Sequence, residues 1–182
     1  MNNFKNVRTI TLTGILIALT IAGNVITKIP IPLGQGLEIR FGFVFFSMIA
    51  FLFGPVVAFA AGLIENTLSY ILGAGGFAGF DIRFGLNMGL AGVIYSIFLY
   101  KRNHKSEYFI IWIIAAKASV NFINHIIINS YLLRFYLGPS ADIINTARIF
   151  KNVMILPVEI IIMLIVLKYA AKAARQYNFI KD

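Results

Sequence analysis

Apolar residues fall into six long runs, which short stretches of glycine, proline and charged residues separate. The runs cover residues 8–27, 41–53, 56–72, 82–100, 108–133 and 144–174. Each run is continuously apolar rather than alternating, which favours helices in a bilayer over the strands of a membrane barrel. The second and third runs are shorter than the roughly 20 residues of a perpendicular span, so we expect them to be tilted or partly enclosed. The pattern predicts one all-α integral membrane domain of six transmembrane helices over residues 1–182.

The composition agrees with a bilayer as solvent. The chain is 59% hydrophobic and 13% charged, with mean hydropathy +0.84, against roughly 45–50% and 25% in soluble domains. The chain has no cysteine, which excludes disulfides, thiolate metal sites and cysteine nucleophiles. The first apolar run is as long as a bilayer span and has no clear cleavage site, so we interpret it as a membrane helix rather than a signal peptide.

The distribution of basic residues predicts which helix ends lie on each side of the membrane. The net charge is +9, but the basic residues lie at the ends of the runs, as membrane anchors do, rather than on a nucleic-acid surface. With the N-terminus inside, nine basic residues lie at cytoplasmic ends: Lys5, Arg8, Lys101, Arg102, Lys105, Lys168, Lys172, Arg175 and Lys181. Six lie at outer ends: Lys28, Arg40, Arg83, Arg134, Arg148 and Lys151. This bias predicts cytoplasmic N- and C-termini and a multi-pass protein of a prokaryotic plasma membrane.

Polar side chains interrupt the apolar runs with helical spacing. In the fifth run Lys117, Asn121, Asn124, His125 and Asn129 share one helix face. Such a stripe must face the bundle or water, because an unsatisfied polar group in lipid costs several kcal/mol. One interpretation is that these groups pair with one another and hold helices together. We favour a structural interpretation for Lys117 and Glu159, either as an ion pair or as groups that snorkel to the membrane surface.

The polar residues gather near the presumed outer ends, beside loops rich in glycine and proline. This pattern predicts a cavity that opens outward. Asparagine amides both donate and accept and suit a weakly charged heterocycle, whereas arginines suit a carboxylate. The residues that we expect to contact a ligand are Arg40, Asp81, Arg83, Asn87, Asn121, Asn124, His125 and Arg148.

No catalytic or metal-binding pattern stands out. The two histidines, His104 and His125, have no nearby nucleophile or carboxylate at metal-ligand spacing. The phosphate-cradling motif G-x-x-x-x-G-K-[ST] is missing. We therefore expect no enzymatic activity, no metal and no cofactor in this chain.

Small residues form a stripe on the first run, "TGILIALTIAGN" (13–24). Gly14, Ala18 and Ala22 recur every four residues. Such a stripe is either a generic packing face or a docking surface for a partner helix.

Three stretches carry a resemblance to a known family. "LEIRFGFVFFSMIAFLFGPVVAFAAGLIENTLSYIL" (37–72), "RIFKNVMILPVEIIIMLIVLK" (148–168) and, more loosely, "INSYLL" (128–133) are similar to the folate-type branch of the substrate-binding S components of energy-coupling factor (ECF) vitamin transporters. The resemblance implies the S-component fold and a high-affinity binding subunit of an ABC importer. Its substrate would be folate or, alternatively, hydroxymethylpyrimidine or pyridoxine. Departures from the branch, such as "AGFDIRF" (78–84) and Glu65 in place of an aspartate, lie where a ligand would sit.

The same resemblance implies partners. These are a membrane coupling subunit (T-component) and two cytoplasmic ATPases that hydrolyse the ATP. Ala18 and Ala22 match the A-x-x-x-A motif with which such helices meet the coupling subunit, and Gly14 extends it by one turn. Residues 30–40 would close over the pocket.

Two other classes stay open. An integral membrane enzyme acting on a lipid or quinone would need acids or histidines near the cytoplasmic headgroups, where residues 101–107 offer mainly a basic loop. A stand-alone transporter would favour inverted repeats and broken helices, which the sequence does not display.

Overall fold

In the computed structural model the described residues are 7–30, 38–73, 80–102 and 106–176. The chain runs through α1 (Val7–Ile26), β1 (Ile29–Pro30), β2 (Glu38–Ile39), α2 (Phe43–Phe53), α3 (Pro55–Ile71), α4 (Ile82–Leu99), α5 (Phe109–Val120), the π-helix η2 (Asn121–Ile128), α6 (Asn129–Leu137), the short 3-10 turn η3 (Gly138–Ser140) and α7 (Ala141–Gln176). Most of the loop predicted to close over the pocket (31–37), most of the glycine-rich loop (74–79), and Lys5, His104, Lys105 and Lys181 lie outside the described residues.

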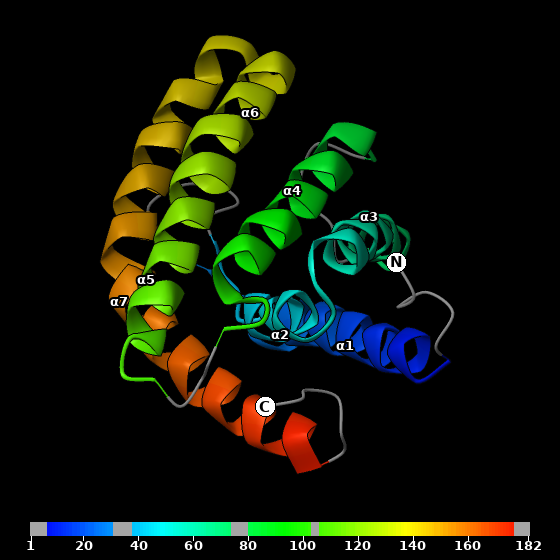
Figure 1. The fold of residues 1–182 in the computed structure, drawn as a ribbon. Helices are drawn as coiled ribbons and strands as arrows, with labels where there is room; N and C mark the ends of the chain where they lie inside the picture. The colour runs from blue at the N-terminus through cyan, green and yellow to red at the C-terminus, as the bar shows by residue number, and fades with distance from the viewer. Residues whose placement is uncertain (1–6, 31–37, 74–79, 103–105, 177–182) are drawn as a thin grey trace.

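The helices form two groups with α4 between them (Figure 1). On one side α5, η2 and α6 make one continuous rod that runs alongside α7. On the other side lie α1, α2 and α3, and α4 packs against both α3 and α5. The helix bounds agree closely with the six apolar runs, apart from the fifth, which continues through α6.

Four helical stretches are long and apolar enough to cross a membrane: Val7–Ile26, Ile82–Leu99, Phe109–Ser140 and Ile144–Ala173. The apolar helices α2 and α3 are shorter. Gly54, with φ of 84°, makes the turn between them, and Pro55 begins α3 at the position where its missing N–H costs nothing. Both helices bury much of their length in the protein, since Phe46, Ile49 and Ala58 are almost fully enclosed.

Glycine lets α3 and α4 pack at very short range. A Cβ atom on Gly62 would lie 2.6 Å from the backbone nitrogen of Gly89, and one on Gly92 would lie 2.7 Å from the carbonyl oxygen of Ala58. Neither position admits a side chain without moving a backbone, as at small-residue helix crossings in membranes. This contact fixes α4 as the central wall of the protein.

Candidate functional site

A cavity of about 310 Å³ lies between the two groups of helices. Polar and charged side chains from α1, the β1–β2 ladder, α3, α4, the α5–α6 rod and α7 line it. They are Asn24, Glu38, Arg40, Glu65, Asn66, Ser69, Asn87, Tyr95, Lys117, Asn121, Asn124, His125, Asn129, Lys151, Asn152 and Glu159. Phe43, Phe46 and Phe84 add aromatic surface. A concave site with apolar walls and converging polar groups is the usual form of a small-molecule site.

One wall is a cluster of three asparagines. The Asn124 side-chain amide donates to the side-chain and backbone oxygens of Asn87 at 2.7 Å each. The Asn87 amide donates in turn to the Asn124 carbonyl oxygen at 3.4 Å and to Oδ1 of Asn129 at 3.3 Å. Asn124 and Asn129 both reach Asn87 because the rod is a π-helix here, and residues five apart lie over one another. Such π segments occur frequently at functional sites.

The second cluster joins α5 to α7. Lys117 Nζ lies 3.2 Å from Glu159 Oε2, and the lysine side chain is 1% exposed. The ammonium also lies 3.6 Å from the centre of the Phe43 ring, and the Asn121 amide donates to the same Glu159 oxygen at 3.4 Å. The predicted ion pair between Lys117 and Glu159 is confirmed, and both residues also line the cavity.

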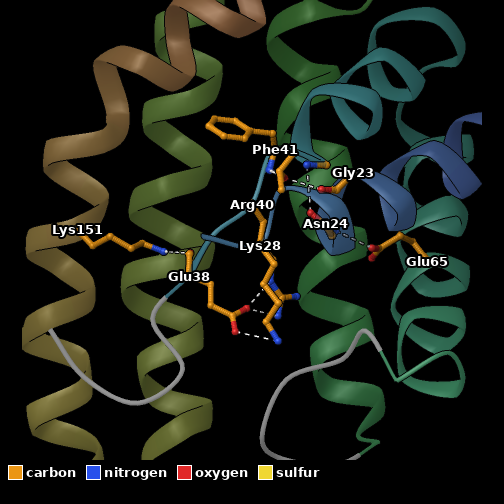
Figure 2. Close-up of polar contacts among 10 residues, drawn as sticks. Gly23, Asn24, Lys28, Glu38, Arg40, Phe41, Glu65 and Lys151 are labelled. Carbon is orange, nitrogen blue, oxygen red and sulfur yellow. Dashed lines mark hydrogen bonds and ion pairs between the residues drawn. The ribbon is translucent and has the colours of Figure 1, made fainter. Parts of the chain in front are cut away.

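The third cluster ties the end of α1 to α2 and α3 (Figure 2). Oδ1 of Asn24 accepts from the backbone N–H of Gly42 at 3.1 Å, and its amide donates to Glu65 at 3.3 Å. Ser69 donates to the same Glu65 oxygen at 3.1 Å. A single asparagine therefore connects three elements of the cavity wall.

The fourth cluster surrounds Glu38 on the β1–β2 ladder (Figure 2). Lys28 Nζ lies 3.0 Å from its Oε1, and Arg40 donates to Oε2 from Nη2 at 2.6 Å and from Nε at 2.9 Å. Lys151 of α7 donates instead to the backbone oxygen of Glu38 at 3.1 Å. Partial burial acts to raise the pKa of the Glu38 carboxyl, but hydrogen bonds from Arg40 and Lys28 and their positive charges hold it below its usual value.

Three buried polar atoms on the cavity wall have no hydrogen-bond partner among the described residues. They are the Tyr95 hydroxyl, Oδ1 of Asn124 and Nδ2 of Asn152. Their side chains are 1%, 1% and 7% exposed. A buried polar group without a partner is costly, so these atoms are the natural places for a ligand to donate and accept.

The chain is similar to known proteins of one family. A model of the S component of ECF-type riboflavin transporters matches residues 4–172, nearly the whole chain. The chain belongs to this S-component family. It is also similar to the crystal structure of FolT bound with folic acid, at 28% identity and a TM-score of 0.71, over 87% of this chain and 91% of that one. No curated protein matches the chain. As a member of this family, the chain is a vitamin-binding transporter subunit of the membrane and not an enzyme.

The S component brings most of the predicted ligand residues together. Arg40, Asn87, Asn121, Asn124 and His125 line the cavity. The predicted polar stripe of the fifth run, from Lys117 to Asn129, faces it throughout.

The other three predicted residues do not line the cavity. Asp81 caps the start of α4 by accepting from the Arg83 backbone N–H at 2.7 Å. The Arg83 guanidinium lies over the Phe135 ring at 4.4 Å. Arg148 lies one helical turn before Lys151 and Asn152, and its Nη1 is buried without a hydrogen-bond partner among the described residues.

Sequence reasoning missed several residues of the S-component cavity as ligand candidates. Asn24 and Asn152 interrupt apolar runs, a signal that could have found them. Glu65 is expected near the ligand but is not among the predicted contact residues. Tyr95 gave no signal, because a tyrosine in an apolar run is indistinguishable from a core residue until its hydroxyl is located. Glu38 lies between two apolar runs, where a charged residue gives no particular signal.

The small-residue stripe of the S component lies elsewhere. Gly14, Ala18 and Ala22 line an apolar groove of about 810 Å³ between α1 and α3, which is separate from the polar cavity. A Cβ on Gly14 would meet no atom within 4 Å. This part of the stripe is therefore open surface rather than internal packing.

Proposed function

We propose that this S component is the high-affinity substrate-binding subunit of an ECF-type ABC importer. It would capture a water-soluble vitamin or precursor outside the cell and deliver it inward when docked on the energy-coupling module. The observation that carries the proposal is the polar cavity with three buried groups that lack a partner among the described residues, on Tyr95, Asn124 and Asn152. We expect Arg40, Asn87, Asn121, Asn124 and His125 to contact the ligand there.

Folate is our first choice of substrate. Lys28 and Arg40 hold the Glu38 carboxylate at the ladder beside the cavity, and Lys151 donates to the Glu38 backbone oxygen. That excess of cations suits the anionic tail of folate better than the uncharged tail of riboflavin, the vitamin for which the family is named. The similarity to a folate-bound structure supports the same choice.

Hydroxymethylpyrimidine or pyridoxine is the alternative. The cavity volume of about 310 Å³ lies at the lower end of the roughly 300–1,000 Å³ of typical ligand sites. A single heterocyclic ring fits within it, with the amides of Asn87 and Asn124 at the ring edge.

The proposal includes topology and partners. We propose six membrane spans with both termini in the cytoplasm, and a T-component and two ATPases that hydrolyse ATP, while this chain carries no cofactor. The groove beside Gly14, Ala18 and Ala22 supports docking of a partner helix, because small residues allow close backbone approach.

Binding by the purified chain tests the proposal. Calorimetry in detergent with folic acid, riboflavin, pyridoxine and hydroxymethylpyrimidine should show one binder with Kd below 1 μM, which is a binding free energy beyond about −8 kcal/mol. Mass spectrometry of the purified protein should find the same compound. Micromolar or weaker binding of every vitamin and precursor would refute the proposal.

A further inference from the structure

The charges around the β1–β2 ladder do not balance. Lys28, Arg40 and Lys151 meet there, and Arg148 of α7 is close enough to Lys151 to interact with it electrostatically. The Glu38 carboxylate contacts Lys28 and Arg40, while Glu65 and Glu159 interact electrostatically with Arg40 and Lys151 from farther away. Because like charges in a partly buried site repel one another, this group is suited to a second anion.

Contacts of its backbone hold Glu38 in place. Pro30 pairs with Glu38 in the ladder, and Lys151 holds the Glu38 carbonyl oxygen rather than its carboxylate. The side chain is 15% exposed and borders the cavity, while the side chains of Lys28 and Arg40 are 53% and 30% exposed. Both cations are therefore within reach of an anion that arrives from solvent, without any opening of the helices.

The other cavity carboxylates are held differently. Glu65 accepts from the neutral groups of Asn24 and Ser69. Glu159 is paired with the buried Lys117 and with Asn121. Lys117 is buried, and Arg40 acts on Glu65 through its charge while it donates hydrogen bonds to Glu38. Of these three carboxylates, Glu38 is therefore the one whose directly bound cations a ligand anion would compete for.

We propose that Glu38 is an internal stand-in for the anionic group of the ligand. The Glu38 carboxylate binds Lys28 and Arg40. An anionic ligand must take over these partners, whereas a neutral ligand leaves them in place. Glu38 thus sets how strongly the site prefers anionic over neutral ligands. The inference rests on the proposed function, in which this cavity holds the transported compound.

The test is a ratio of two affinities measured by calorimetry on the full chain. The probes are folic acid and folic acid with both tail carboxylates converted to amides, which share a ring and differ in charge. Glu38→Gln should raise the affinity for folic acid by roughly fivefold to tenfold relative to the affinity for the diamide, as expected when one partly buried ionic competitor is removed. Glu38→Asp keeps the charge and should keep the wild-type ratio. Asp142→Asn removes an exposed charge from the first turn of α7, outside the cavity, and should also keep it.

A purely structural role for Glu38 predicts a different result. Glu38→Gln would then weaken both compounds by the same factor, and that outcome overturns the inference. Should Glu38→Gln fail to fold, Lys28→Gln replaces it, since this lysine is half exposed. A severalfold loss of affinity for folic acid alone supports the inference, and an equal loss of affinity for both compounds overturns it.

Failure of the proposed substrate would be visible separately. Wild-type protein that binds neither folic acid nor the diamide refutes the folate assignment. The ratio is then measured with pyridoxine and 4-pyridoxic acid, which also differ by a carboxylate. A gain for the acid in Glu38→Gln supports the stand-in role, and an equal change for both overturns it. Binding of none of these compounds refutes the inference.

Discussion

Asn124 donates its side-chain amide to both oxygens of Asn87, which lies 37 positions earlier in the chain. The bond joins the π-helical part of the rod to α4 and forms one wall of the cavity. Asn87 is 9% exposed and Asn124 is 1% exposed. The pair therefore holds the two helices together, while Oδ1 of Asn124 lies on the cavity wall without a hydrogen-bond partner among the described residues.

Loss of the Asn87 side chain should lower both the stability of the protein and its affinity for ligand. Asn87→Ala leaves Asn124 and Asn129 with missing partners, and we expect a loss of about 1–3 kcal/mol in the free energy of unfolding. Ligand affinity should fall as well, because Asn124 is no longer oriented. Thermal unfolding in detergent and calorimetry measure the two effects. Asn145→Ala is the control. The Asn145 amide donates to the Ser130 backbone oxygen at 3.4 Å, and Asn145 does not line the cavity, so this variant should leave ligand affinity unchanged. Equal affinity losses in both variants would contradict the prediction.

The Lys117–Glu159 pair should behave as a unit. Lys117→Met leaves the Glu159 charge unpaired, and Glu159→Gln leaves Lys117 unpaired, so each should cost about 3–5 kcal/mol of stability. The double variant should cost less than the sum of the two, because no unpaired charge remains. A double-mutant cycle on unfolding measures the coupling. Strict additivity would show that the two charges do not interact.

The glycine contact between α3 and α4 should tolerate no side chain. Gly62→Ala places a methyl group 2.6 Å from the Gly89 backbone, and we expect it to destabilise the protein by about 1–3 kcal/mol. Gly14→Ala is the matched control, since its new methyl group meets no atom within 4 Å. It should be neutral or slightly stabilising through better helix propensity. Unfolding midpoints of the two variants give the comparison, and similar midpoints would disprove close packing at Gly62.

Bulky residues in the groove of α1 should separate binding from transport. Ala18→Trp with Ala22→Trp fills the groove and blocks close approach of a partner helix. We expect ligand affinity to survive, while cellular uptake and co-purification with the coupling subunit fail. Leu19→Trp is the control, because Leu19 is 41% exposed and lies outside the groove. Normal uptake in the double variant would show that the small-residue stripe is not a docking surface.

Acid should loosen the β1–β2 ladder through Glu38. The pKa of this carboxyl is lower in the folded protein than its ordinary value, so the stabilisation is fully present above the ordinary value. It is lost as the pH falls through the folded pKa, when protonation ends the ion pairs with Lys28 and Arg40. Wild type should thus lose more stability than Glu38→Gln between pH 5 and more acidic conditions. Parallel pH profiles of the unfolding midpoint would contradict this.

The sequence by itself determined the helices, the family and the polar face of the fifth run. Continuous apolar runs have few alternatives to helices in lipid, because backbone polar groups must be satisfied within the segment. Intramembrane asparagines and charges must face the interior, which is why Asn121, Asn124 and His125 could be placed before any coordinates.

Only the tertiary structure decided which polar groups meet. Helical spacing placed Asn124 and Asn129 on one face, but the π-helix and the packing against α4 are what bring both of them to Asn87. Asp81 and Arg83 carry the right chemistry, but the local cap at the start of α4 uses the first, and Phe135 packs under the second. Glu38 became part of the site because the β1–β2 ladder and Lys151, which is 113 positions away, hold it there. Such long-range pairing depends on how the helices pack, and packing is a property of the whole chain rather than of any one segment.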